Sequence, residues 1–505
     1  MSNKNSYLKK YNVLIFNNIL LGLLIIIFNL MIYSVDLNQG SKIVLFGWLG
    51  YIVLLWGIIT FYKIKKSNIN LYTFFFIIYM LFSYGQILLY ALGIQHPRYD
   101  LISDYSKTEI LSYCSYFILS TVFFLNGSII AIRKDRKLVK NEVKRKERDS
   151  KVNQSFNKTV KVVSWFFFLI SSPVYLYNLL SNIITSIQYG YGALYGYDDP
   201  NFQASNSSFL NIFNSFGNWF IPSLLFLLVL YKKNKKFKYF FTFMIIAVIG
   251  GNFMTGGRGG AMTLTLAVLF LWDSEIKRFG KRRKIFLVLF LIIIISMLPV
   301  IATYRGLANK SLASLVIAIA NNESENLIVD VVAELGFSMR PWLMVNRLIP
   351  QSMNFKLGQS YIASFLAVIP SILLGGYSFT KYANLSQWLM DTLNMSYGPG
   401  FSMHAESFYN FGWFGIPFMF FIGWFYYKLI SNNFIKGPMA RYKNVLSTIT
   451  FYMFAMNIRG SMYLTIRNEV YFVLLPVLII YLIYSTQKKK YALNRKQIKQ
   501  DTNGG

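Results

Sequence analysis

Several arginines stand apart from every run of positive charge, beside glycine, proline or aromatic residues. Arg258 lies in Thr255-Gly256-Gly257-Arg258-Gly259-Gly260, and the others of interest are Arg305, Arg340, Arg347, Arg459 and Arg467. A guanidinium group offers a planar fork of N–H donors that fits two phosphate oxygens better than a lysine ammonium does. Several such groups at one opening would suit a pyrophosphate, whereas any single one could instead reach a membrane interface.

The surroundings of Arg258 favour an anion. Flanking glycines let a backbone approach a ligand closely, and a helix starting just after Arg258 would point the positive end of its dipole at that ligand. The apolar runs on either side hold about 17 and 13 residues, or roughly 25 and 20 Å at 1.5 Å per residue, which is short for a bilayer. Short spans interrupted by glycine indicate a binding site. The alternative is a structural arginine paired with a carboxylate of a neighbouring span, and Glu334 is a candidate partner for an arginine.

A second candidate segment runs from Gly398-Pro399-Gly400 through Ser402, His404, Glu406 and Tyr409 to Gly412. The glycine–proline turn predicts a helix start with Ser402 as its N-cap. In the first turn of that helix the dipole keeps His404 neutral, as a general base must be. Glu406 is the rival base. The two side chains would point about 200° apart on a helix, so they cannot both face one site. Tyr409 is taken as a supporting residue.

Metal and nucleotide chemistry find little support in the sequence. The chain has two histidines, His96 and His404, and one cysteine, Cys114, so a His/Cys metal centre and a disulfide framework are set aside. The acidic pair Asp198-Asp199 could suggest a metal site, but Asp-Asp before Pro200 is typical of an ordinary turn. The sequence contains no Walker A loop, no dinucleotide fingerprint after a strand and no Gly-x-Ser-x-Gly motif. We therefore predict no metal and no cofactor.

Composition indicates that membrane helices position these residues. The 505 residues are 55% hydrophobic and 14% charged, with a mean hydropathy of +0.42. A net charge of +31 would suggest nucleic acid in a soluble protein, but most of the 51 lysines and arginines form clusters that alternate with apolar runs. That alternation follows the positive-inside rule, and we predict a lipid bilayer and no nucleic acid as partner. The predicted fold is all-α, a polytopic membrane protein with about 12 transmembrane helices.

The predicted spans lie between basic clusters at the N-terminus, 63–66, 133–161, 232–238, 277–284, 428–443 and the tail from Lys488. Their parity is consistent with both termini in the cytoplasm. The spans are 12–34, 43–62, 71–93, 109–132, 161–182, 209–231, 239–255, 260–272, 285–304, 412–430, 444–458 and 469–486.

The chain divides into six predicted segments. These are N-terminal transmembrane helices (1–132), a basic cytoplasmic loop (133–161), central transmembrane helices with the break at 255–260 (162–304), a large external loop (305–411), C-terminal transmembrane helices (412–487) and a basic cytoplasmic tail (488–505). Runs such as 361–374 in the external loop are too short and too interrupted by proline to span, which predicts short interfacial or re-entrant helices.

An ordered set of motifs in the second half resembles a known family. Thr-Gly-x-Arg-Gly (255–259) precedes Glu-x-Gly-x-x-x-Arg-Pro (334–341), Leu-Ile-Pro (348–350), Gly-x-Ser-Tyr (358–361), Ile-Pro (369–370) and His-x-Glu-x-x-x-Asn-Phe-Gly (404–412). Together they resemble the Wzy-type oligosaccharide repeat-unit polymerases of bacterial O-antigen, capsule and exopolysaccharide pathways. The likeness covers roughly 240–470, and the first half matches only as a hydropathy pattern.

The resemblance implies a GT-C-like glycosyltransferase in the bacterial cytoplasmic membrane. Its substrate would be an oligosaccharide on a polyprenyl (undecaprenyl) pyrophosphate carrier, with a flippase and a chain-length regulator as further partners. His404 or Glu406 would activate the acceptor hydroxyl, and the pyrophosphate would be bound by Arg258, Arg305, Arg340, Arg347, Arg459 and Arg467. Two alternatives stay open: a ligase that transfers the same lipid-linked glycan once to another acceptor, and a flippase that binds the lipid without chemistry.

Overall fold

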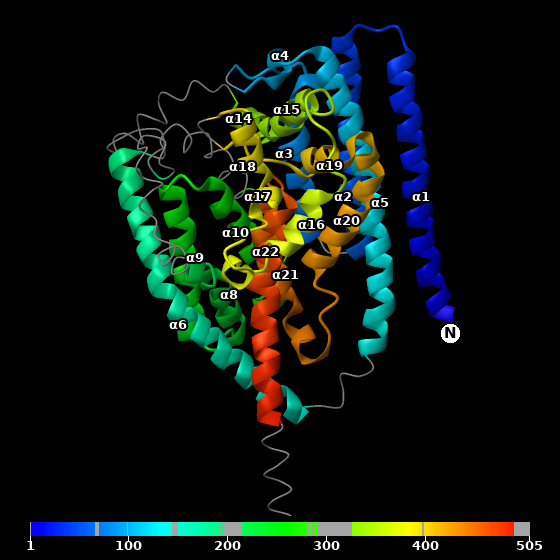
Figure 1. Cartoon of the computed structure of the whole chain (residues 1–505). Coiled ribbons are helices and arrows are strands. Elements are labelled where there is room, and N and C mark those ends of the chain that lie inside the picture. The colour runs from blue at the N-terminus through cyan, green and yellow to red at the C-terminus, as the bar shows by residue number, and fades with distance from the viewer. Residues whose placement is uncertain are drawn as a thin grey trace, which may run out of the picture.

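The architecture is a bundle of helices, seen in a computed structural model (Figure 1). It describes residues 2–65, 70–97, 99–143, 150–190, 194, 215–280, 282–283, 287, 289, 326–395 and 398–488. Within these ranges every regular element is helical, which confirms the predicted all-α class. The long helices are α1 (Ser2–Ser34), α2 (Gln39–Lys65), α3 (Leu71–Ala91), α5 (Lys107–Val143), α6 (Ser150–Tyr189), α8 (Phe220–Leu230), α9 (Lys235–Met254), α10 (Arg258–Leu271), α20 (Gly415–Ser431) and α21 (Lys443–Asn457).

Shorter elements complete the described part of the chain. They are α4 (Leu101–Asp104), the π-helical turn η2 (Trp272–Ile276), α14 (Leu327–Gly336), η3 (Phe337–Met339), α15 (Arg340–Leu348), α16 (Gln359–Leu366), η4 (Ser371–Leu374), α17 (Thr380–Ala383), α18 (Leu385–Thr392), α19 (Met403–Phe411), η5 (Gly412–Phe414), η6 (Gly437–Tyr442), α22 (Met462–Glu469) and η7 (Val470–Leu474).

Eight helical segments among the described residues are long and apolar enough to cross a membrane. Five follow predicted spans to within four residues at each end, at 12–34, 39–63, 71–91, 107–133 and 235–254. Gln154–Tyr189 extends past the predicted 161–182 at both ends, and Met462–Lys488 starts before the predicted 469. The segment Met403–Ser431 starts earlier than the predicted 412, because α19 runs through η5 into α20. The helices α8, α10 and α21 are shorter than a full crossing. Nearly all of the predicted span 285–304 lies outside the described residues, so a total of twelve stays a prediction.

The tightest packing joins α5 to α20. A methyl group added at Gly127 would collide with the carbonyl oxygen of Phe420, and one added at Gly423 would collide with that of Phe124. Small residues let two helix backbones approach in this way, which matters in a membrane because van der Waals contact rather than water exclusion holds helices together. Ser128 donates a hydrogen bond to the Gly423 carbonyl at 3.1 Å. The helix pair is therefore locked at one register.

Two clusters of buried side chains divide the bundle. One joins α2, α3, α5, α19 and α20 and is rich in stacked aromatic rings, such as Tyr79 on Phe124 at 4.8 Å between centroids. The other joins α6, α8, α9, α10 and α21 with the C-terminal helix. Figure 1 shows these groups side by side, with α1 on the outer flank of the first and α6 on the outer flank of the second. The two clusters meet at α21, whose side chains contribute to both.

The short helices between α14 and α18 pack on one end and one side of the bundle, as predicted for the loop 305–411. In Figure 1, α14 and α15 lie at the end opposite the N-terminus, while α16 and α17 lie lower, against α22. The contact of α14 with α3 is close, since a methyl group added at Gly336 would collide with the backbone of Gln86. These helices therefore cover the ends of α3 and α22.

Candidate active site

One face of α3 collects three of the groups that the sequence singles out. Tyr79, Phe82 and Gln86 follow the i, i+3, i+7 spacing that places side chains on one side of a helix. Tyr79 contacts His404, Phe82 lies under Arg459, and Gln86 donates from Nε2 to the carbonyl oxygen of Ala333 at 3.1 Å, next to Glu334. Seven residues of helix rise about 10 Å. We call these three residues the α3 stripe.

His404 lies at the inner end of the α3 stripe. Ser402 caps α19 by accepting from the Ala405 N–H at 3.2 Å, so the predicted N-cap is confirmed and His404 falls in the first turn. Its Nε2 is 2.7 Å from the Tyr79 hydroxyl, which is 3.0 Å from Thr121 Oγ1. The ring is 1% exposed and packs on Phe117. A chain of polar atoms thus leads from His404 into α3 and α5.

Glu406 points to the other side of α19, as the predicted 200° separation requires. One carboxylate oxygen accepts from Ser360 Oγ at 2.8 Å and the other from the Met462 N–H at 2.6 Å. Asn410, one turn further, donates to Ser360 Oγ at 2.7 Å and accepts from the Gly358 N–H at 3.0 Å. Glu406 and Asn410 therefore tie the starts of α16 and α22 to α19, and His404 and Glu406 serve different surroundings.

Arg459 is held above the α3 stripe by the loop that precedes α19. Its carbonyl oxygen accepts from the Phe401 N–H at 3.0 Å, and its guanidinium carbon lies 5.5 Å from the centre of the Phe82 ring. Gly400, beside Phe401, has a φ of +74°, a conformation that suits glycine. The Gly-Pro-Gly turn thus sets both Arg459 and the start of the helix that carries His404.

Arg258 begins α10, at the break that the sequence predicts. Gly256 turns the chain with a φ of +85°. Arg258 as a whole residue is 9% exposed, and its guanidinium group forms a two-pronged ion pair with Glu334 of α14. Nη1 lies 2.9 Å from Oε2. A methyl group at Gly260 would meet no described atom within 4 Å. The pairing alternative left open by the sequence is present, and a pyrophosphate role for Arg258 stays a prediction.

Arg340 and Arg347 form a second group around Tyr105 rather than on the α3 stripe. Arg347 binds Glu109 through two contacts of 2.5 and 3.0 Å, and its guanidinium carbon lies 4.2 Å from the centre of the Tyr105 ring. These hydrogen bonds raise the pKa of Arg347 above its ordinary value. Arg340 interacts with the Tyr105 phenol and lies over Phe337. The group joins α15 to the start of α5.

The remaining predicted residues lie apart or outside the description. Arg467 of α22 is exposed and donates to the Tyr463 hydroxyl at 2.7 Å. Tyr409 is buried against Trp388, with ring centroids 4.6 Å apart. Arg305 lies outside the described residues. Within the described ranges, no cluster of three or more His, Cys, Asp or Glu side chains could hold a metal ion.

Sequence reasoning missed the residues that organise these groups. Tyr79 and Gln86 are polar side chains within an apolar span, and that position marks functional or structural contacts in membrane proteins. Asn410 stands four residues after Glu406, so the two share one face of α19. The sequence shows these positions, but it does not show which helix each residue would contact.

Fold and site together define a class of protein: a polytopic helical membrane protein in which a buried histidine and an exposed arginine contact one helix, α3, and a buried arginine pairs with a helix packed against α3. The family model described as O-antigen polysaccharide polymerase Wzy matches residues 14–490. The chain therefore belongs to the Wzy O-antigen polysaccharide polymerase family, whose members polymerise oligosaccharide repeat units and are multi-pass proteins of the bacterial inner membrane. Comparison with curated proteins and with solved structures finds no match.

Proposed function

We propose that this chain is a glycosyltransferase that extends a glycan on a polyprenyl pyrophosphate carrier by whole repeat units. The hydroxyl oxygen of a new lipid-linked repeat unit attacks the anomeric carbon of the growing chain. The bond from that carbon to the pyrophosphate oxygen breaks, polyprenyl pyrophosphate leaves with the electron pair, and the hydroxyl proton passes to a base of the protein. The observation that supports this most is that His404 and Arg459 contact the α3 stripe, while Arg258 pairs with Glu334, next to the Ala333 carbonyl to which Gln86 of the stripe donates.

The arginines stabilise the leaving group. Negative charge develops on the pyrophosphate as the bond breaks, and preformed cationic donors in a site of low dielectric stabilise that charge. Arg459 lies above Phe82 of α3, and Arg258 at the N-terminus of α10 pairs with Glu334 of α14, which packs against α3. The helix dipole of α10 adds to the charge of Arg258. Glu334 orients the guanidinium group of Arg258. Arg340 and Arg347 lie on the neighbouring Tyr105 group, where they bind the glycan-bearing end of the carrier or hold α15 in place.

His404 is the base in this proposal. The proposal assigns the Tyr79 hydroxyl as the donor to Thr121 Oγ1, 3.0 Å away, and Nε2–H of His404 as the donor to the Tyr79 oxygen, 2.7 Å away. In that tautomer Nδ1 is the atom that accepts the proton. The His404 ring is 1% exposed, so the side chains that cover it must move before the acceptor hydroxyl can reach it. Glu406 holds α16 and α22 in position. It becomes the base if His404 proves dispensable.

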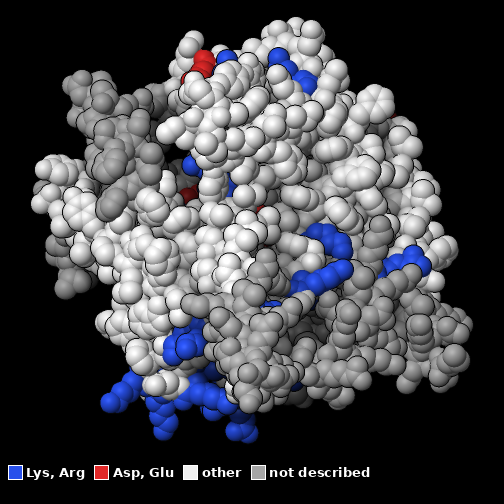
Figure 2. Space-filling view, turned by 60° about the horizontal axis from the view of Figure 1, so that its bottom comes forward, with Lys and Arg blue, Asp and Glu red and all other residues white. Residues whose placement is uncertain are grey.

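The orientation follows from charge and from the termini. The N-terminus and the end of the C-terminal helix lie at the same end of the bundle (Figure 1). Lysine and arginine gather on the lower part of the face in Figure 2, where acidic atoms are scarce. We assign that end to the cytoplasm because cationic segments resist translocation. The α3 stripe then meets its substrate near the external face.

The test is polymerisation by the purified protein in liposomes. A lipid-linked repeat unit is supplied without nucleotide or metal, and the products are separated on a gel. We expect a ladder spaced by one repeat, most of which is lost in Arg258→Lys because an ammonium cannot form the two-pronged contact. Membrane insertion of the variant should be intact. A single transfer to a different acceptor would instead make the chain a ligase, and lipid translocation without product would make it a flippase.

A further inference from the structure

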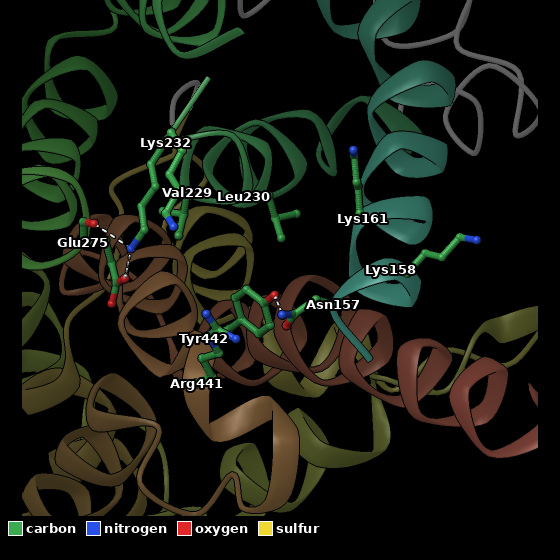
Figure 3. A pocket seen from close by; sticks show the side chains of 10 residues that line it. Asn157, Lys158, Lys161, Val229, Leu230, Lys232, Glu275, Arg441 and Tyr442 are labelled. Carbon is green, nitrogen blue, oxygen red and sulfur yellow. Dashed lines mark hydrogen bonds and ion pairs between the residues drawn. The ribbon is translucent and has the colours of Figure 1, made fainter. Parts of the chain in front are cut away.

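A separate basic pocket opens at the end of the bundle assigned to the cytoplasm. It encloses about 470 Å³ and is lined by ten residues, Asn157, Lys158, Lys161, Val229, Leu230, Lys232, Lys233, Glu275, Arg441 and Tyr442. Figure 3 shows that these side chains come from α6, from the end of α8 and the turn after it, from η2 and from η6. The volume lies in the range of small-molecule sites.

The lining is strongly cationic. Five of the ten residues are lysine or arginine, and Glu275 is the one carboxylate among them. Lys232 satisfies that carboxylate, with its Nζ 3.3 Å from Oε2, and Asn444 donates to the other carboxylate oxygen at 2.8 Å. The pocket therefore keeps a net positive charge after its acid is neutralised. An anion is the ligand that such a pocket favours.

Neighbouring contacts hold the pocket open. The Tyr442 hydroxyl donates to Asn157 Oδ1 at 2.8 Å and joins η6 to α6 (Figure 3). Lys161 lies over the Tyr231 ring, 4.5 Å from its centre, and Trp165 donates to the Tyr231 hydroxyl at 2.9 Å. The cations at the two sides of the pocket are thus fixed on elements that are bonded to one another.

An apolar stripe leads from the pocket into the depth of the membrane. Lys158, Val162, Phe166 and Leu169 follow one another at spacings of four, four and three along α6, which places them on one face. Val162, Phe166 and Leu169 are each about 60% exposed, on the outer flank of the bundle. A molecule with an anionic head and apolar tails fits both parts at once.

We propose that this pocket binds an anionic phospholipid of the cytoplasmic leaflet. The phosphate occupies the space between Lys158, Lys161, Lys233 and Arg441, and the acyl chains lie along the α6 stripe. Basic pockets between membrane helices on the cytoplasmic side bind anionic head groups in this manner. The occupant stabilises the contact of α6 with α8 and η6. This inference is independent of the polymerisation chemistry at the other end of the bundle.

Binding of phosphatidylglycerol to the full-length, delipidated protein in detergent tests the proposal. At about 0.15 M salt, screening confines electrostatic effects to roughly 8 Å, so only nearby charges matter. The variant Lys158→Gln/Lys161→Gln/Lys233→Gln should bind about 100-fold more weakly, at roughly fivefold for each cation. The matched control, Lys235→Gln/Lys236→Gln/Lys277→Gln, removes the same charge from the same end outside the pocket. It should change affinity less than about fivefold.

Other arms separate the possible occupants. A Lys→Arg triple variant at 158, 161 and 233 should retain binding, which shows that the loss follows charge and not folding. Phosphatidylcholine should not compete. Equal loss in the pocket and control variants, equal binding of phosphatidylcholine, or competition by inorganic phosphate as effective as that by phosphatidylglycerol would each overturn the proposal.

Discussion

The ion pair between Arg258 and Glu334 permits a test that separates catalysis from packing. The perturbation is the set Arg258→Gln, Glu334→Gln and the double variant. Arg258 is almost fully buried and the Glu334 side chain is 23% exposed. Removing one partner of a buried pair costs about 3–5 kcal/mol, and allowance for the partial exposure of Glu334 leaves about 2–3 kcal/mol. The two glutamines can bond to each other, so the double variant should lose about 1 kcal/mol or less.

Stability and activity should then behave differently across the same three variants. Unfolding in detergent should report a coupling energy of about 3–5 kcal/mol, because the single losses sum to about 4–6 kcal/mol and the double variant loses only about 1 kcal/mol. Polymerisation should fall about 10²–10³-fold in Arg258→Gln, the cost of losing one donor to a developing charge. It should stay that low in the double variant, since the arginine is still missing.

The activity of the double variant decides the outcome. Recovery to within about tenfold of the wild-type rate, beside recovered stability, would mean that Arg258 serves only to neutralise Glu334. The reasoning from the α3 stripe would then be refuted for this residue. The Arg347–Glu109 pair gives a comparison for stability, since Arg347 is 52% exposed and its coupling energy should be about 0.5 kcal/mol.

Three further predictions concern the helix contacts and the rival bases. Gly423→Ala should destabilise the protein by about 1–3 kcal/mol in detergent unfolding because it overpacks the α5–α20 contact. The control Gly250→Ala, where the added methyl group meets no described atom within 4 Å, should stabilise the protein by about 0.5–1 kcal/mol. Equal effects of the two substitutions would mean that the α5–α20 contact is not tight. His404→Gln should lower the kcat of polymerisation about 10²–10⁴-fold, and Tyr79→Phe should lower it about tenfold, with KM little changed in both. A normal rate in His404→Gln would show that another residue is the base. Glu406→Gln should lower stability by about 1–3 kcal/mol, since its amide nitrogen would face a hydrogen-bond donor; unchanged stability with polymerisation abolished would instead make Glu406 the base.

The sequence predicted elements and local geometry well. Hydropathy located the long spans, the glycines around Arg258 located the break before α10, and Ser402 located the start of α19. The helical period correctly separated the directions of His404 and Glu406. Each of these depends on residues within a turn or two of one another.

The association of helices was not predictable in the same way. Hydropathy states that α3 is buried in a membrane or a protein, but it does not state that Tyr79 meets His404 or that Phe82 meets Arg459. Those pairings depend on how closely backbones approach, as at Gly127 with Phe420 and Gly336 with Gln86. The earlier start of the span at Met403 has the same origin, because Glu406 and Asn410 find polar partners on other helices and can therefore be buried.

The bond between Tyr79 and His404 also has a consequence for biogenesis. Its two ends are 325 residues apart, so α3 leaves the ribosome long before its partner exists. Until α19 arrives, the Tyr79 hydroxyl has Thr121 as its polar neighbour, and the α3 stripe faces lipid or unassembled helices. The contacts of the α3 stripe with His404 and Arg459 are thus completed among the last steps of assembly. A chain that stalls before α19 therefore holds its inserted helices without the partner that buries the Tyr79 hydroxyl.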